Sequence, residues 1–151
     1  MHKHRLAFKV GSQNTEVTQQ YMLDVGDAAG HKLRAFEIKR TFPTDPPKFN
    51  GVAVAQSWAR GMSDYIDGSG SGLVYIIYDL EGGDHVFTRS MLVAQQTSDG
   101  SGKSTSVSAG VITGGTGKFA AIAGIANATS IFDPNSGFNA TDFEIEYWMA
   151  N

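Results

Sequence analysis

Two strand-like runs are joined by a glycine-rich turn within residues 110–124. Gly114, Gly115 and Gly117 can adopt positive φ angles without the steric penalty of a Cβ atom, so the chain can reverse tightly there. Phe119 and Ile122 follow the turn and are large enough to cover the end of a sheet. The segment therefore predicts two antiparallel strands whose shared end is closed by apolar side chains.

Similar segments, rich in β-branched and aromatic residues, recur between turn clusters along the whole chain. No window keeps the period of a major helix, and one helical turn at 117–121 is the only helix expected. Eight or nine strands could close into a barrel, which has no exposed edges. We therefore expect an all-β chain with one domain over residues 1–151 and a frayed terminus at 1–5. The expected strands are 6–10, 16–25, 33–42, 51–66, 72–80, 85–96, 104–113, 122–132 and 141–149.

Composition excludes several classes of function. The 151 residues are 41% hydrophobic and 18% charged, which suits one compact core. The net charge of −3 provides no basic surface for nucleic acid. The absence of cysteine excludes disulfides and thiolate ligands, and the four scattered histidines predict no metal site. No apolar run is long enough to span a bilayer and no leader is evident, so a cytoplasmic location is expected.

Two glycine-lysine motifs resemble nucleotide-binding loops. Residues 100–105 end like a phosphate-binding loop, but that pattern needs glycine at the position of Thr97 and a helix where a strand is predicted. Residues 115–120 begin like a dinucleotide fingerprint, but Ala120 occupies the position of its third glycine. Both loops are therefore interpreted as turns, and no cofactor is expected.

Five charged residues interrupt otherwise apolar strand faces: Glu16, Arg60, Arg89, Glu144 and Glu146. By alternation, Arg60 lies on a face with Trp58, and Arg89 lies on a face with Phe87 and Met91. An arginine that points inward needs a counter-charge, and Glu144 and Glu146, which share a face with Trp148, are the expected partners. The predicted catalytic residues are Arg89, Glu146, Arg60 and Glu144.

The aromatic residues near these charges leave two interpretations open. They could line a cavity in which arginine–carboxylate pairs anchor the polar group of an apolar ligand, or they could fill the barrel around a structural ion pair. The predicted ligand-binding residues are Trp58, Tyr75, Phe87, Met91 and Tyr147.

The strand predicted over residues 73–80 is apolar on both of its faces. A barrel wall that faces water on its outer side does not need such a pattern, whereas a subunit interface does. The chain is therefore predicted to form a homo-oligomer.

The turn Gly114-Gly115-Thr116-Gly117-Lys118-Phe119 and the strands around it resemble a signature of the allene oxide cyclase and dirigent families. Residues 68–97 resemble the same families more weakly, through a glycine-serine start, an aromatic strand and an acidic-glycine turn. The resemblance implies a closed, antiparallel, eight-stranded, calycin-like barrel with little helix. It also implies association through the outer walls, as a dimer or trimer.

The same resemblance implies an enzyme that promotes cyclisation or isomerisation of a small, mostly apolar substrate inside the barrel. Arg89 or Arg60 would then hold an anionic or carbonyl oxygen, and Glu146 or Glu144 would stabilise a cation or move a proton. Two alternatives stay open: a non-catalytic binding protein for a small hydrophobic molecule, and an oligomeric scaffold with a filled barrel.

Overall fold

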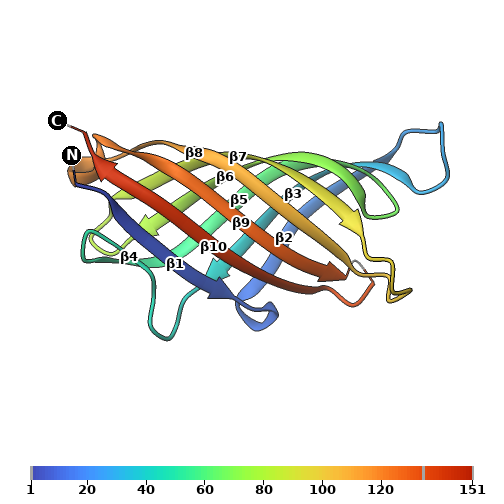
Figure 1. Cartoon of the computed structure of the whole chain (residues 1–151), viewed down its shortest axis with the longest axis horizontal. Coiled ribbons are helices and arrows are strands. Elements are labelled where there is room, and N and C mark those ends of the chain that lie inside the picture. Colours follow the sequence, from blue (N-terminus) through green and yellow to red (C-terminus); the bar gives the residue numbers. More distant parts are fainter. Residues whose placement is uncertain (1, 134, 151) are drawn as a thin grey trace.

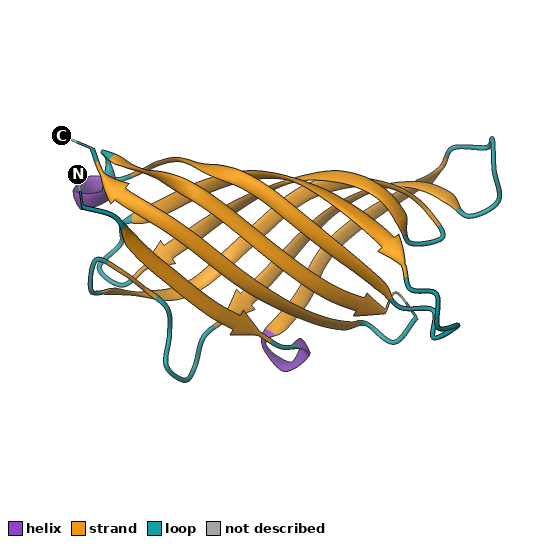
Figure 2. Cartoon of the chain, in the orientation of Figure 1, coloured by secondary structure: helices purple, strands orange, loops and turns teal. Residues whose placement is uncertain are grey.

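The structure, a computed structural model, describes residues 2–133 and 135–150 (Figures 1 and 2). Within these residues the chain forms ten strands and two short 3-10 turns. The turns are η1 (Ser12–Asn14) and η2 (Gly117–Phe119). The strands are β1 (His4–Val10), β2 (Thr15–Asp24), β3 (His31–Thr41), β4 (Lys48–Phe49), β5 (Val52–Ile66), β6 (Ser69–Leu80), β7 (His85–Gln96), β8 (Ser104–Gly115), β9 (Ile122–Asp133) and β10 (Phe138–Met149).

Neighbouring strands are antiparallel and follow the order β1-β10-β9-β8-β7-β6-β5-β3-β2 around a steeply tilted, barrel-like sheet (Figure 1). β4 lies off this path and pairs with β5. β1 and β2 are the first and last strands of the path, and the described residues form no ladder of hydrogen bonds between them. The expectation of a closed eight-stranded barrel is therefore wrong: the fold is all-β and barrel-like, but hydrogen bonds do not close it.

The open seam lies between two strands that run in the same direction. Strand directions alternate along the path, so its two end strands, β1 and β2, run the same way, and η1 joins them in the chain. β1 pairs with β10, whereas β2 pairs with β3. The Ser12 hydroxyl, in η1, accepts a hydrogen bond from the backbone N–H of Asn139 at 2.8 Å and connects η1 to β10.

One end of the barrel is filled by large apolar side chains. The ring of Phe49 lies 5.5 Å from that of Tyr78 and 5.3 Å from that of Tyr147. Phe119, in η2, is 2% exposed, which confirms that the residues after the glycine turn cover the end of the sheet. A Cβ atom on Gly115 would lie 2.5 Å from the carbonyl oxygen of Phe119, so this close approach requires glycine.

A β-bulge in β5 decides which of its faces points inward. The pairing with β6 shifts between Val54 and Gln56, so the inner face passes from Val54 to Ser57 and Ala59. From Ser57 to Ser63 the inner side chains are small, whereas the bulky Trp58, Arg60 and Met62 point outward. This part of the wall consequently leaves space inside the barrel.

The nine expected strands are all present, with boundaries that differ by a few residues. β4 was not expected, because two residues are too few to show a periodic pattern. The helical turn expected near residue 117 is η2. His4 and Arg5, which were expected to fray, pair with Tyr147 and Glu146, while Met1 lies outside the described residues.

Candidate functional site

A cavity of about 140 Å³ lies inside the barrel, away from the filled end. Its lining comes from β3 and from β5 to β10, so most of the wall contributes to it. The space exists because several inward side chains are small. These are Ala59, Ser63, Ser106, Ser108, Ala128 and Ser130.

Arg40, on β3, points into this cavity and is 6% exposed. Its guanidinium carbon lies 5.4 Å from the centre of the Phe143 ring, which gives the cation one aromatic contact. Its Nε atom is buried and has no hydrogen-bond partner among the described residues. Burial lowers the pKa of Arg40 to about 10, because the low-polarity interior disfavours the charged form.

Tyr78 is fully buried next to this arginine, on the filled side of the cavity. Its hydroxyl oxygen also lacks a hydrogen-bond partner within the described part of the chain. Burial raises the pKa of Tyr78, and the positive charge of Arg40 partly opposes that rise. The hydroxyl is therefore protonated at neutral pH and can donate a hydrogen bond.

A second arginine lies on the same face of β3. Arg34 donates from Nε to Oε1 of Gln20 at 2.9 Å, and its guanidinium carbon lies 4.9 Å from the centre of the Phe36 ring. Burial lowers the pKa of Arg34. Beside it, burial raises the pKa of Tyr65, whose ring stacks on Phe132 at 6.2 Å.

The rest of the polar lining is neutral. The hydroxyls of Ser130 and Thr141 share a hydrogen bond of 2.9 Å, and Thr141 also donates to Oδ1 of Asn139 at 3.0 Å. None of the described residues that line the cavity is an aspartate or a glutamate. The interior therefore combines two cations, hydroxyl groups and apolar surface, and it favours an anion or a hydrogen-bond acceptor.

The two arginines predicted from the sequence lie on the outer wall. Arg60 donates from Nε to Oε2 of Glu37 at 2.7 Å, and this bond, ahead of those from Thr18 and Gln19, lowers the pKa of Glu37 to about 2. Arg89 is exposed, because it follows the inward-facing Thr88. Neither Arg60 nor Arg89 is among the residues that line the interior cavity.

Glu144 and Glu146 also point outward, from β10. Glu144 accepts a hydrogen bond from Arg5 at 2.5 Å, and Glu146 lies 3.4 Å from Lys3. Their expected pairing with Arg60 or Arg89 is not found within the described residues: Arg5 lies on the neighbouring β1, and Lys3 directly precedes that strand. A catalytic role for these four residues stays a prediction that no contact to the cavity supports.

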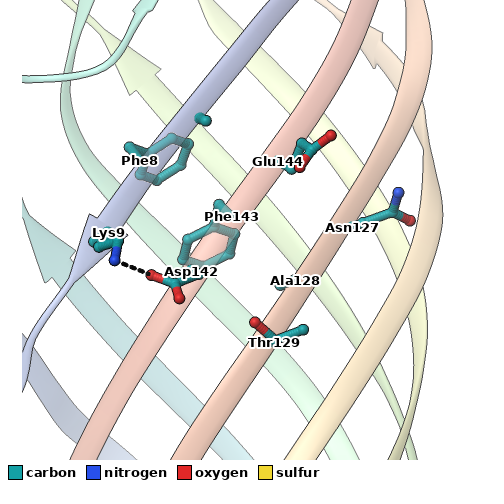
Figure 3. A pocket seen from close by; sticks show the side chains of 9 residues that line it. Phe8, Lys9, Asn127, Ala128, Thr129, Asp142, Phe143 and Glu144 are labelled. Carbon is teal, nitrogen blue, oxygen red and sulfur yellow. Dashed lines mark ion pairs between the residues drawn. The ribbon is translucent and has the colours of Figure 1, made fainter.

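Glu144 borders a depression of about 300 Å³ over β1, β10 and β9 (Figure 3). Lys9 and Asp142 form an ion pair of 3.8 Å beside it. Ala128 and Phe143 line both this depression and the interior cavity, so the sheet itself is the wall between them. The depression is rimmed by exposed charges and is a surface feature of the outer wall.

Four of the five predicted ligand-binding side chains also point outward. Trp58 contacts the cations of Lys39 and Arg60 on the outer face. Phe87 stacks on His85 at 6.1 Å, while Tyr75 and Met91 are exposed. Only Tyr147 points inward, and it belongs to the filled end, where its hydroxyl accepts a hydrogen bond from the Asn50 amide at 2.7 Å.

Sequence reasoning missed Arg40 and Arg34, although a signal for them was present. The expected strand over residues 33–42 places Arg34, Phe36, Ile38 and Arg40 on one face by simple alternation. The prediction instead chose residues from the face of the 51–66 strand that carries the larger side chains, Trp58 and Arg60. In the structure that face is the outer one.

No helix within the described residues is long and apolar enough to cross a bilayer. The same residues contain no group of three or more histidine, cysteine, aspartate or glutamate side chains placed to hold a metal ion.

Comparison with known proteins assigns no family to the chain. No protein-family model matches it, and no curated protein does. Among solved structures, the chain is similar to that of the pterocarpan synthase dirigent protein GePTS1, with 16% sequence identity and a TM-score of 0.40. That alignment covers 99% of this chain and 89% of the other. With these values, the similarity assigns neither a family nor an activity to this chain.

Proposed function

We propose that this protein binds a small, mostly apolar molecule inside its barrel. The observation that carries the proposal is the cavity of about 140 Å³, lined by apolar and hydroxyl side chains around one buried arginine. Ligand sites commonly combine an apolar wall with a few placed polar groups. An apolar cavity of about 150 Å³ can hold one benzene ring, so the expected ligand is one ring or a short chain.

Cyclisation or isomerisation of such a ligand is the second candidate function. The buried Arg40 guanidinium offers hydrogen-bond donors inside the cavity, where it would stabilise negative charge that develops on an oxygen. In this proposal Arg40, and not Arg89 or Arg60, holds the anionic or carbonyl oxygen of the substrate. Conversion of a polyene epoxide by the wild type, but not by Arg40→Met, would support it, whereas equal conversion by both would exclude it.

Kinship with the allene oxide cyclase and dirigent families is likewise a proposal. It rests on the glycine turn at residues 114–119, which is followed by a buried phenylalanine and a strand. The scaffold alternative requires a barrel without a ligand-sized space, and the cavity is evidence against it.

The binding proposal can be tested with one pair of matched variants. Ala128→Leu adds a larger side chain to the cavity lining, whereas Ala7→Leu makes the same change on the exposed outer face of β1. We expect benzamide, benzyl alcohol or benzoate to shift the amide NMR signals of the cavity lining in the wild type and in Ala7→Leu. Ala128→Leu should lose these shifts while it retains a folded spectrum. If none of the three probes binds the wild type, the proposal is wrong.

A further inference from the structure

Two charged residues line the cavity, Arg34 and Arg40. Within the described residues, Arg40 has neither an acidic partner in the cavity nor a hydrogen bond at Nε. A buried cation without a counter-ion is costly, because it loses its hydration and gains little in return. The contact with Phe143 replaces only part of that hydration. The site is therefore incomplete as the polypeptide forms it.

The missing partner of Arg40 is a hydrogen-bond acceptor. A guanidinium carries several N–H donors in a planar fork and accepts no hydrogen bond, so it favours a group that has more than one acceptor oxygen. A carboxylate meets that requirement, because its two oxygens can accept two parallel hydrogen bonds from one guanidinium.

The surroundings of Arg40 determine what the rest of such a ligand must be. Ile38, Ala59, Ile76 and Ala128 offer apolar surface, and the small space admits one ring or a short chain. The described lining contains no carboxylate that would repel an acid, and Arg34, the second cation, adds to the attraction.

On this basis we propose that the ligand of the cavity is a small carboxylic acid, bound as its anion by the Arg40 guanidinium. This inference rests on the binding function proposed above. It adds the chemical class of the ligand and names the residue that selects it.

Benzoate and benzamide are suitable probes, because they share one shape and differ in charge. We expect the wild type at pH 7 to bind benzoate at least about tenfold more tightly than benzamide, since a charged acceptor strengthens both hydrogen bonds. The dissociation constants would come from amide NMR titrations. The Nε–H signal of Arg40 should shift with benzoate and report the contact directly.

Arg40→Met removes the charge and keeps a long side chain. The benzoate preference should fall to within about twofold while benzamide still binds, because only the charged contact is lost. Arg60→Met is the matched control, since Arg60 lies on the outer wall in an ion pair with Glu37, and there the preference should persist. Arg40→Lys keeps the positive charge but lacks the planar fork of donors, so it should weaken benzoate binding severalfold, and it tests the site even if Arg40→Met does not fold.

The outcomes separate the two proposals. If the wild type binds benzoate and benzamide equally, the acid inference is wrong and the binding function stands. A benzoate preference that survives Arg40→Met would also overturn the inference, and so would unchanged benzoate binding by Arg40→Lys if Arg40→Met does not fold. If none of the one-ring probes binds, the binding function itself fails.

Discussion

Tyr147 illustrates how one polar atom ties a short connection to the barrel. Its ring is buried at the filled end, and its hydroxyl accepts the backbone N–H of Asn50 at 2.7 Å. Asn50 lies just after β4, with a positive φ of 47° that non-glycine residues seldom adopt. The hydrogen bond therefore stabilises a turn that the local sequence does not favour.

Tyr147→Phe should lower the free energy of unfolding by about 1 to 2 kcal/mol, because it leaves a partly buried amide without its acceptor. Urea unfolding of the variant and of the wild type measures the difference. Tyr75→Phe is the matched control, since Tyr75 is 45% exposed on the outer wall, and it should change stability by less than about 0.5 kcal/mol. Equal effects of the two substitutions would contradict the assigned role.

At the scale of elements, the hairpin of β2 and β3 is the least supported part of the sheet. Almost all of β2 is exposed on both faces, and the hairpin extends beyond the rest of the barrel (Figure 1). His31, directly after the turn of the hairpin, connects this turn end to β5, with Nδ1 2.6 Å from Asp27 and Nε2 2.6 Å from Asp64. A protonated imidazole donates both hydrogen bonds, so the hairpin is held best when His31 is charged.

These contacts make the stability of the hairpin depend on pH. The hydrogen bonds to Asp64 and then Asp27 raise the pKa of His31 above 6.5, and the bond to His31 lowers the pKa of Asp27 below 3.8. The histidine contribution is complete below pH 6.5 and is lost as pH rises through the raised pKa. The aspartate contribution is present above pH 3.8 and is lost as pH falls.

His31→Gln should therefore destabilise the protein most between about pH 4 and 6.5, and the difference from the wild type should shrink at alkaline pH. Unfolding in urea at pH 5.5, 7 and 9 tests this. Asp64→Asn should show the same pH dependence, because it removes one of the two acceptors. A difference that stays constant over this range would contradict the arrangement.

At the scale of the whole molecule, the outer wall carries an unusual amount of apolar surface. Val93 pairs with Val107 and Val111 pairs with Ile125 across β7, β8 and β9, and these four side chains are 48–60% exposed. Met91 lies beside them and is 58% exposed. Continuous apolar surface of this kind is typical of a subunit interface, and we propose a second copy of this chain as its partner.

Light scattering after size-exclusion chromatography should consequently show a dimer or trimer at micromolar concentration. Met91→Glu places a charge inside the apolar surface and should reduce the mass to that of a monomer. Gln95→Glu places the same charge on the exposed end of β7 and should leave the assembly intact. A monomeric wild type would exclude the proposal.

The sequence by itself determined the fold class and nearly all of the strands. Turn residues and β-branched segments mark these elements locally, so the nine long strands and the helical turn at η2 could be predicted. β4 could not be predicted, because its two residues form a strand only through their pairing with β5.

Only the tertiary structure decided which face of each strand is the inside. Alternation sorts residues into two faces, but a shift of one residue exchanges them, and the bulge after Val54 is such a shift. The bulky face that holds Trp58 and Arg60 therefore lies outside, and Arg40 on β3 occupies the cavity. Whether the sheet closes was likewise decided by tertiary structure, because closure depends on how β1 and β2 lie relative to each other and not on either strand alone.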